Sequence, residues 1–153
     1  MSIGIEIDRA DLAAIERVFA SLSAPDRHGL MEALAVEGGS QTRRRISQEK
    51  SAPDGSPWAP WTDDYAATRH GGHSLLEGEG DLLDSITAAA TTDAAMWGSN
   101  LPYAAIHQYG GTPDMPPGPA AIPERPYLGL SAENADDLLA VARDWLDAQI
   151  GGR

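Results

Sequence analysis

The placement of proline and glycine constrains this chain more than any other sequence feature. Three of its 11 prolines fall in residues 50–80 and five in residues 112–123, and both stretches also contain glycine. Proline lacks a backbone donor and glycine weakens helices and strands, so both stretches should form long loops. Regular structure is therefore expected before, between and after them.

The first 49 residues carry one strand pattern and two helix patterns. Isoleucine at every second position predicts a short strand over 3–7. Apolar residues on one helical face predict a first helix over 9–22 and a second over about 25–49. Gly38 and Gly39 interrupt the second pattern. Because each glycine costs about 1 kcal/mol in a helix interior, we expect a kink or a break there.

The segment between the two proline-rich stretches predicts a hairpin followed by a short helix. Alternating residues over 82–90 and 94–98 flank a turn at 91–93, which is typical of a β-hairpin. A proline before residues 103–109 and a glycine after them are boundary signals for a helix.

The C-terminal part predicts one more helix. Residues 127–128 fit either a brief strand or a packed turn, and Ser131 is a good N-cap for a helix that runs to the glycine pair 151–152. With 153 residues, the chain is expected to be a single domain over 1–153. The elements together predict an α+β fold, in which a small antiparallel sheet with a hairpin packs against two to four helices joined by long Pro/Gly-rich loops.

Charge and composition argue against several classes of protein. The chain has 23 acidic and 11 basic residues and a net charge of −12, which argues against wrapping nucleic acid but not against letting DNA pass without holding it. It has no cysteine, so disulfides and thiolate metal sites are excluded. We see neither a membrane-spanning apolar run nor a signal-peptide pattern, so we expect the protein to stay in the cytosol or in a particle assembled there.

Catalytic and metal sites have little support in the sequence. His70 and His73, beside Glu77 and Glu79, are residue types that bind zinc, but they lie in a glycine-rich loop without helical spacing. His107 fits a capped helix end, and neither a nucleophile elbow nor a glycine-rich phosphate loop occurs. We therefore expect no enzyme and no cofactor. A small metal-dependent hydrolase using these three histidines is the outlying alternative.

Two groups of side chains are better candidates for contact surfaces. Arg43, Arg44 and Arg45 form the basic cluster of the chain. They suit the negative end of a helix, or they face an acidic neighbour such as a second copy of the chain. Trp58 and Trp61 stand in a proline-rich loop, where each either folds back onto the domain or anchors in a partner.

Several segments in fixed order carry a resemblance to a known family. They are Pro53–Pro60, Leu75–Leu76, Gly80–Ile86, Trp97–Ser99, Tyr103–Gly111 and Ile122–Ser131. Taken together they resemble the phage virion morphogenesis family, the tail-completion proteins of Mu-like and related tailed phages. One departure lies at Ile46, where the family's usual aromatic residue near the end of the second helix is replaced or absent.

The resemblance implies a structural protein rather than an enzyme. Such a protein completes the tail so that it joins the filled head stably, as a ring of identical subunits in the neck of the virion, assembled in the host cytoplasm. Six is the expected count, because tail tubes are stacked hexamers. A tail-tube terminator and a head-side neck protein are the alternatives within the same machine.

The expected partners are other copies of the chain, the tail tube or its terminator, and head-side neck or connector proteins. DNA would pass through the ring without specific binding, and no membrane is involved. The interface candidates are Arg43, Arg44, Arg45, Trp58, Trp61, Tyr103, His107, Gln108, Tyr109, Arg125 and Tyr127.

Overall fold

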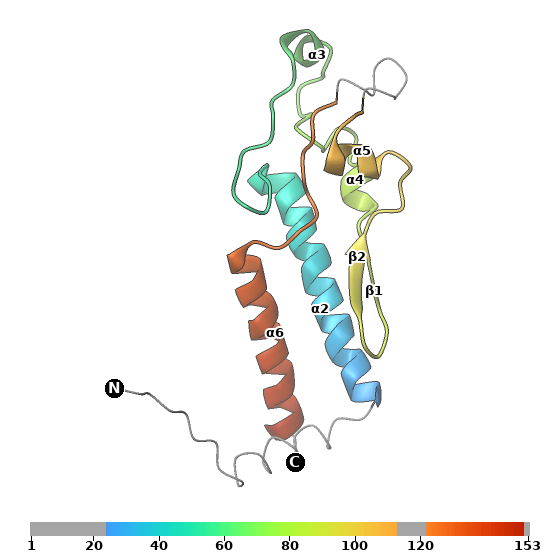
Figure 1. Cartoon of the computed structure of the whole chain (residues 1–153), viewed down its shortest axis with the longest axis vertical. Coiled ribbons are helices and arrows are strands. Elements are labelled where there is room, and N and C mark those ends of the chain that lie inside the picture. Colours follow the sequence, from blue (N-terminus) through green and yellow to red (C-terminus); the bar gives the residue numbers. More distant parts are fainter. Residues whose placement is uncertain (1–23, 113–121, 152–153) are drawn as a thin grey trace, which may run out of the picture.

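One long helix forms the centre of the molecule. The computed structural model describes residues 24–112 and 122–151. Helix α2 (Ala24–Arg44) lies between helix α6 (Ala132–Gly151) on one side and the hairpin of β1 (Thr87–Ala90) and β2 (Ala95–Gly98) on the other (Figure 1). Beyond the end of α2, the loops and short helices form a head.

Two of the expected elements and most of the second loop fall outside the part that the structure describes. These are the strand over 3–7, the helix over 9–22 and residues 113–121. The single-domain organisation stays a prediction.

The expected break at Gly38 and Gly39 is wrong, because α2 continues through both residues without interruption. The reason is a tertiary contact between the helix and the hairpin. A Cβ atom on Gly38 would lie 2.5 Å from the indole ring of Trp97 on β2. The glycine therefore gives the tryptophan room to pack directly on the helix backbone, and this close approach offsets the low helix propensity of glycine.

The hairpin is confirmed, and its first strand is shorter than expected. The two strands are antiparallel, with Thr87 opposite Gly98 and Ala90 opposite Ala95. The residues expected to begin the strand instead form helix α4 (Asp81–Asp84), which buries Leu82. Apolar residues over so short a run fit either a helix or a strand, so the pattern alone did not distinguish them.

The last residues of the second predicted helix form a π-helix instead of continuing as an α-helix. Residues Arg45–Glu49 form the π-helix η1, which Lys50 terminates in the left-handed conformation with φ 55°. The long loop that follows also contains a short helix, α3 (Asp63–Ala67), where the sequence showed no periodicity.

The last two helices match their boundary signals. Helix α5 (Ala104–Tyr109) is followed by Gly110. At the start of α6, Ser131 Oγ accepts the Asn134 N–H at 3.0 Å, and Asn134 Oδ1 accepts the Ser131 N–H at 3.2 Å. This is a reciprocal cap. Residues 127–128 belong to a packed turn and not to a strand.

The core lies in the head, around the end of α2, and not between the two long helices. Its buried members come from segments far apart in the sequence: Ile46, Trp58, Leu82, Ile86, Ala104 and Tyr127. Ile46, at the position where the sequence departs from the family pattern, is fully buried. Five α-helices and a two-stranded antiparallel sheet in the described residues confirm the α+β prediction.

The contact between Gly38 and Trp97 gives a stability prediction. We expect Gly38→Ala to lower the free energy of unfolding by about 1–3 kcal/mol, because the added methyl group overpacks against the indole. Chemical denaturation measures this. The matched control is Gly29→Ala on the same helix, whose Cβ would lie 3.6 Å from Trp145 Nε1, an ordinary contact. There we expect no loss, and a loss as large as that of Gly38→Ala would contradict the packing explanation.

Candidate docking site

The segment that follows the second loop is held by side chains rather than by a sheet. Gln108 Oε1 accepts the N–H groups of Tyr127 at 3.0 Å and Leu128 at 2.9 Å, while its Nε2 donates to the Leu128 carbonyl at 3.2 Å. The Tyr127 hydroxyl donates to the Ala104 carbonyl at 3.2 Å. Gln108 therefore gives this turn the backbone partners that a neighbouring strand would otherwise supply.

The three consecutive arginines take three different roles. Arg45 is 1% exposed and donates to the carbonyls of Tyr127 at 3.2 Å and Gly129 at 2.9 Å, and to the side chain of Asn134. Burial lowers the pKa of Arg45, and the nearby Glu49 carboxylate partly offsets this. The Arg45 guanidinium thus joins the end of α2 to the turn and to the start of α6.

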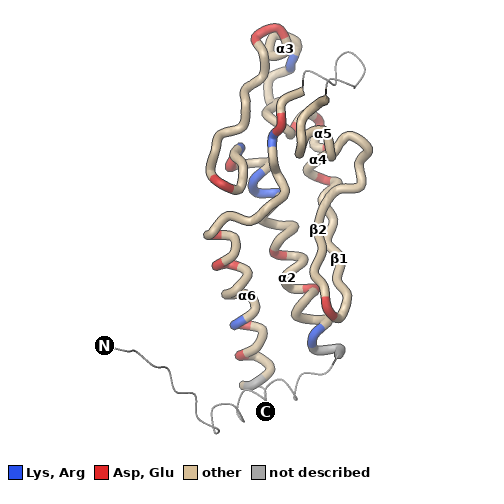
Figure 2. The backbone as a smooth tube through the Cα atoms, viewed as in Figure 1, with Lys and Arg blue, Asp and Glu red and all other residues tan. Residues whose placement is uncertain are grey.

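The other two arginines lie nearer the surface. Arg43 is exposed and donates to the Ile86 carbonyl. Arg44 lies 3.4 Å from Glu49 and 3.8 Å from Asp137, in half-exposed ion pairs. Figure 2 shows basic residues gathered where α2 meets the head, while acidic residues are spread along the helices.

Residues 59–77 project beyond the core as an arm, which carries α3 (Figure 1). Two contacts fix the first end of the arm. Trp58 is 5% exposed, and its Nε1 donates to the Pro126 carbonyl at 2.9 Å. Arg125, also buried, donates from Nε to the Ala59 carbonyl at 2.8 Å and from Nη2 to the Pro60 carbonyl at 3.2 Å.

The lysine of the chain fixes the other end of the arm. Lys50 Nζ donates to Ser74 Oγ at 2.8 Å, to the Leu75 carbonyl at 3.0 Å and to Glu77 Oε2 at 3.0 Å. It also donates to the Ile46 carbonyl in η1. Hydrogen bonds from Lys50 and Ser74 lower the pKa of Glu77. The arm is therefore held at each end by a cation that binds backbone carbonyls.

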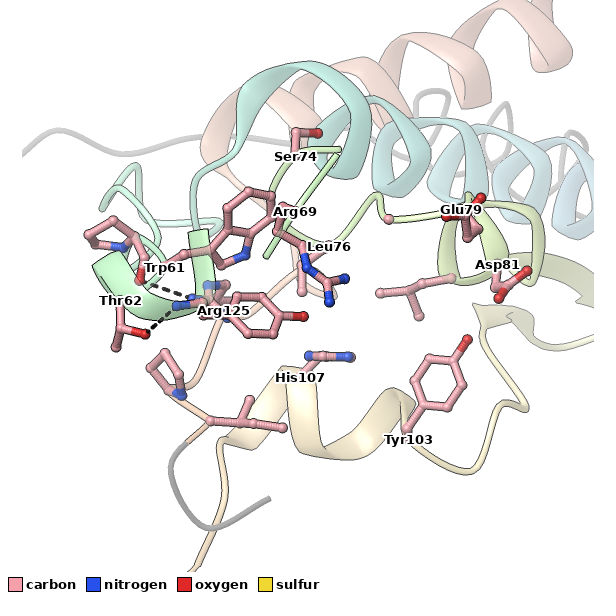
Figure 3. A pocket seen from close by; sticks show the side chains of 16 residues that line it. Trp61, Thr62, Arg69, Ser74, Leu76, Glu79, Asp81, Tyr103, His107 and Arg125 are labelled. Carbon is pink, nitrogen blue, oxygen red and sulfur yellow. Dashed lines mark hydrogen bonds between the residues drawn. The ribbon is translucent and has the colours of Figure 1, made fainter. Parts of the chain in front are cut away.

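A pocket of about 670 Å³ lies between the arm and α5. Trp61 and Tyr65 line it from the arm, with ring centroids 5.8 Å apart in an edge-on contact, and the Arg69 guanidinium lies 4.4 Å from the centre of the Tyr65 ring. Figure 3 shows Trp61 and Arg69 facing Tyr103 and His107 across the pocket. The lining is thus largely apolar, with aromatic rings on both walls.

Charged side chains also line the pocket, with arginines on one side and carboxylates on the other. Arg69 is exposed on the arm, and Glu79 and Asp81 lie toward α4 (Figure 3). His107 packs edge-on against Tyr103 at 5.9 Å. Burial, and then the neighbouring Arg125, lower the pKa of His107, so its ring is neutral at neutral pH. Such an arrangement suits an apolar guest with few polar groups.

The structure brings four of the eleven interface candidates together in this pocket: Trp61, Tyr103, His107 and Arg125. Trp58, Arg45 and Tyr127 are buried within the head, so Trp58 takes the alternative in which it folds back onto the domain. Tyr109, by contrast, is 77% exposed. The interface role of the exposed candidates stays a prediction.

The sequence interpretation missed three residues that shape the site. No role was predicted for Lys50, although a single lysine directly after a helix could have been singled out as a candidate. Tyr65 lies in α3 and Arg69 two residues after its end, and the start of α3 was marked by the N-cap Thr62 and by two acidic residues in the first turn. That segment was too short for periodicity to reveal it.

The histidines do not form a metal site in the described residues. His70 and His73 stack edge-on at 5.7 Å, and His73 Nε2 lies 3.0 Å from Glu79 Oε1. Across residues 24–112 and 122–151, no three potential ligands are grouped closely enough to hold an ion. The hydrolase alternative therefore gains no support from this part of the chain. Likewise, no helix there is both long and apolar enough to cross a membrane.

Comparison with known proteins decides the family. The model of the phage virion morphogenesis family matches residues 10–147. The chain belongs to this family. A protein provisionally named capsid assembly protein G, from Escherichia phage Mu, is 34% identical over 154 residues, which cover 98% of this chain and 96% of the relative. No solved structure matches the chain.

A second relative covers part of the chain. The Mu-like prophage FluMu G protein 2 of Haemophilus influenzae is 38% identical over 79 residues, which cover 52% of this chain and 56% of the relative. Together with the family match, these similarities identify the chain as a phage protein with a role in virion morphogenesis. They confirm the resemblance seen in its motifs.

The contact between Lys50 and Glu77 predicts a pH dependence of stability. The pKa of Glu77 is lowered in the folded state, so the pair stabilises the fold above the usual glutamate pKa of about 4.3 and loses this effect as the pH falls through the lowered value. We expect Glu77→Gln to be less stable than the wild type at pH 7 and the difference to shrink towards pH 3. Urea denaturation across this range measures it. The control is Glu79→Gln, at a side chain that is 77% exposed, and it should change stability little. Equal effects from both variants would contradict the stabilising role of the Lys50–Glu77 contact.

Proposed function

We propose that this protein is a ring-forming tail-completion subunit at the head–tail junction of a phage, where it finishes the tail and allows the head to join stably. Family membership supports a role in virion morphogenesis. The finer assignment rests on the motif resemblance to tail-completion proteins and on the docking site. The Mu relative carries a capsid assembly name, which suits a subunit that meets the head as well as the tail.

The observation that carries the proposal is the rigidly held arm with its aromatic pocket. A head fixed by buried arginines presents a concave, largely apolar site. Such a site binds a segment of another protein rather than converting a substrate. In a ring of identical subunits each interface is heterologous, so one surface must project and another must receive it.

The acidic character of the chain fits a ring around DNA. A net charge of −12 makes counterion release on DNA contact small, so DNA could move through the ring without being held. In this proposal the ring holds six subunits, touches the tail tube or its terminator on one side and a neck or connector protein on the other, and remains in the virion neck after assembly in the host cytoplasm.

Particles made without the protein test this function. A phage that carries an amber codon in this gene, grown on a non-suppressing host, should yield DNA-filled heads and separate tails of normal length, seen by negative-stain electron microscopy. Supplying the wild-type chain from a plasmid should restore joined, infectious particles. Overlong tails would indicate a tail-tube terminator instead, and intact infectious particles without the protein would contradict the proposal.

A further inference from the structure

The exposed side of α6 carries an acid, an apolar side chain and a base in a row. Asp136, Leu139 and Arg143 are all exposed, and Leu139 is 53% exposed. Their spacing of three and four residues places them along one face of the helix, which we call the α6 face. In the described part of the chain neither Asp136 nor Arg143 forms an ion pair, whereas Asp137 pairs with Arg44 at 3.8 Å.

The pocket between the arm and α5 offers groups that match this row. Arg69 stands on one side of the pocket, and Glu79 and Asp81 stand on the other (Figure 3). Aromatic side chains, among them Trp61 and Tyr103, line it as well. An acid would therefore meet a cation on one side, a base would meet carboxylates on the other, and an apolar side chain would meet aromatic rings.

One molecule cannot join these two surfaces by itself. Helix α6 packs against α2 and runs from the head away from the arm and α5 (Figure 1). The α6 face is therefore distant from the pocket of its own chain and is open to a second molecule. Two copies that each carry a net charge of −12 repel one another in most orientations, and pairs of opposite charges at fixed places select the orientation that allows contact.

We propose that the α6 face of one copy of the chain docks on the pocket of the next copy. Asp136 then meets Arg69, Arg143 meets the carboxylates of the pocket, and Leu139 enters between the aromatic rings, as in other contacts of a helix with a groove. The contact is head-to-tail, since the two surfaces are different, and such contacts close into a ring when the rotation between copies allows it. The inference deepens the proposed function, on which it rests, by naming the two surfaces that build the ring.

Cysteine cross-linking tests the contact, because the chain has no native cysteine. The double variant Leu139→Cys with Tyr103→Cys places one thiol on the α6 face and one on the pocket wall. Treated with a short bismaleimide and separated on a denaturing gel, it should give a ladder of covalent dimers and larger species. The matched control pairs Leu139→Cys with Met96→Cys, at a 48% exposed residue of β2 away from the pocket. We expect the control to give several-fold less ladder.

A charge exchange separates a specific contact from poor folding of the variants. In the cross-linking variant, Arg69→Asp should reduce the ladder several-fold, because the contact then brings two acids together. Adding Asp136→Arg should restore the ladder, since opposite charges meet again in reversed order. A protein that had merely lost its fold through Arg69→Asp would not recover through a second substitution on a distant helix.

Three outcomes would overturn the inference: a ladder no stronger than that of the Met96→Cys control, a ladder that Arg69→Asp leaves unchanged, and a loss that Asp136→Arg does not restore. The proposed function is tested separately, by particles made without the protein. Any of the three outcomes together with separate heads and tails would refute the docking contact and leave the proposed function standing. A restored ladder together with intact, infectious particles lacking the protein would refute the proposed function alone.

Discussion

The head of this molecule depends on one buried cation. Arg45 stands at the end of the central helix, and its guanidinium binds the carbonyls of Tyr127 and Gly129 and the side chain of Asn134. The two carbonyls belong to an irregular turn outside the described sheet, and Asn134 belongs to the start of α6. A planar group with several donors suits this position, because one side chain satisfies several buried acceptors in fixed directions. The turn then positions Arg125, which reaches the arm.

The pocket follows from this order of contacts. The central helix fixes the turn, the turn fixes the first end of the arm through Arg125, and Lys50 fixes the second end. The arm can therefore project far from the core and still hold Trp61 and Tyr65 opposite α5. A preorganised wall lowers the entropy lost on binding, which is what a docking surface in an assembled particle requires.

The sequence predicted the elements that local signals control. The hairpin, α5 and the capped start of α6 follow from alternation and from boundary residues close to each element. The expected break at Gly38 failed because Trp97, far away in the sequence, packs on that glycine. The sequence predicts for Arg45, as for Arg43 and Arg44, a place at the negative end of a helix or on a face towards an acidic neighbour, since nothing local distinguishes the three. Of the pocket, the sequence supplied Trp61, Tyr103, His107 and Arg125 as candidates, but not Tyr65 and Arg69, which lie on the arm and depend on long-range contacts.

The most direct measurement compares two neighbouring arginines by chemical denaturation. If Arg45 organises the head, Arg45→Met should lower the free energy of unfolding by about 3–5 kcal/mol, since buried carbonyls and Glu49 lose their cation. Arg44→Met, which breaks half-exposed ion pairs, should cost less than about 1 kcal/mol. Similar, small losses for both variants would show that the head is held by its apolar core and would contradict this account.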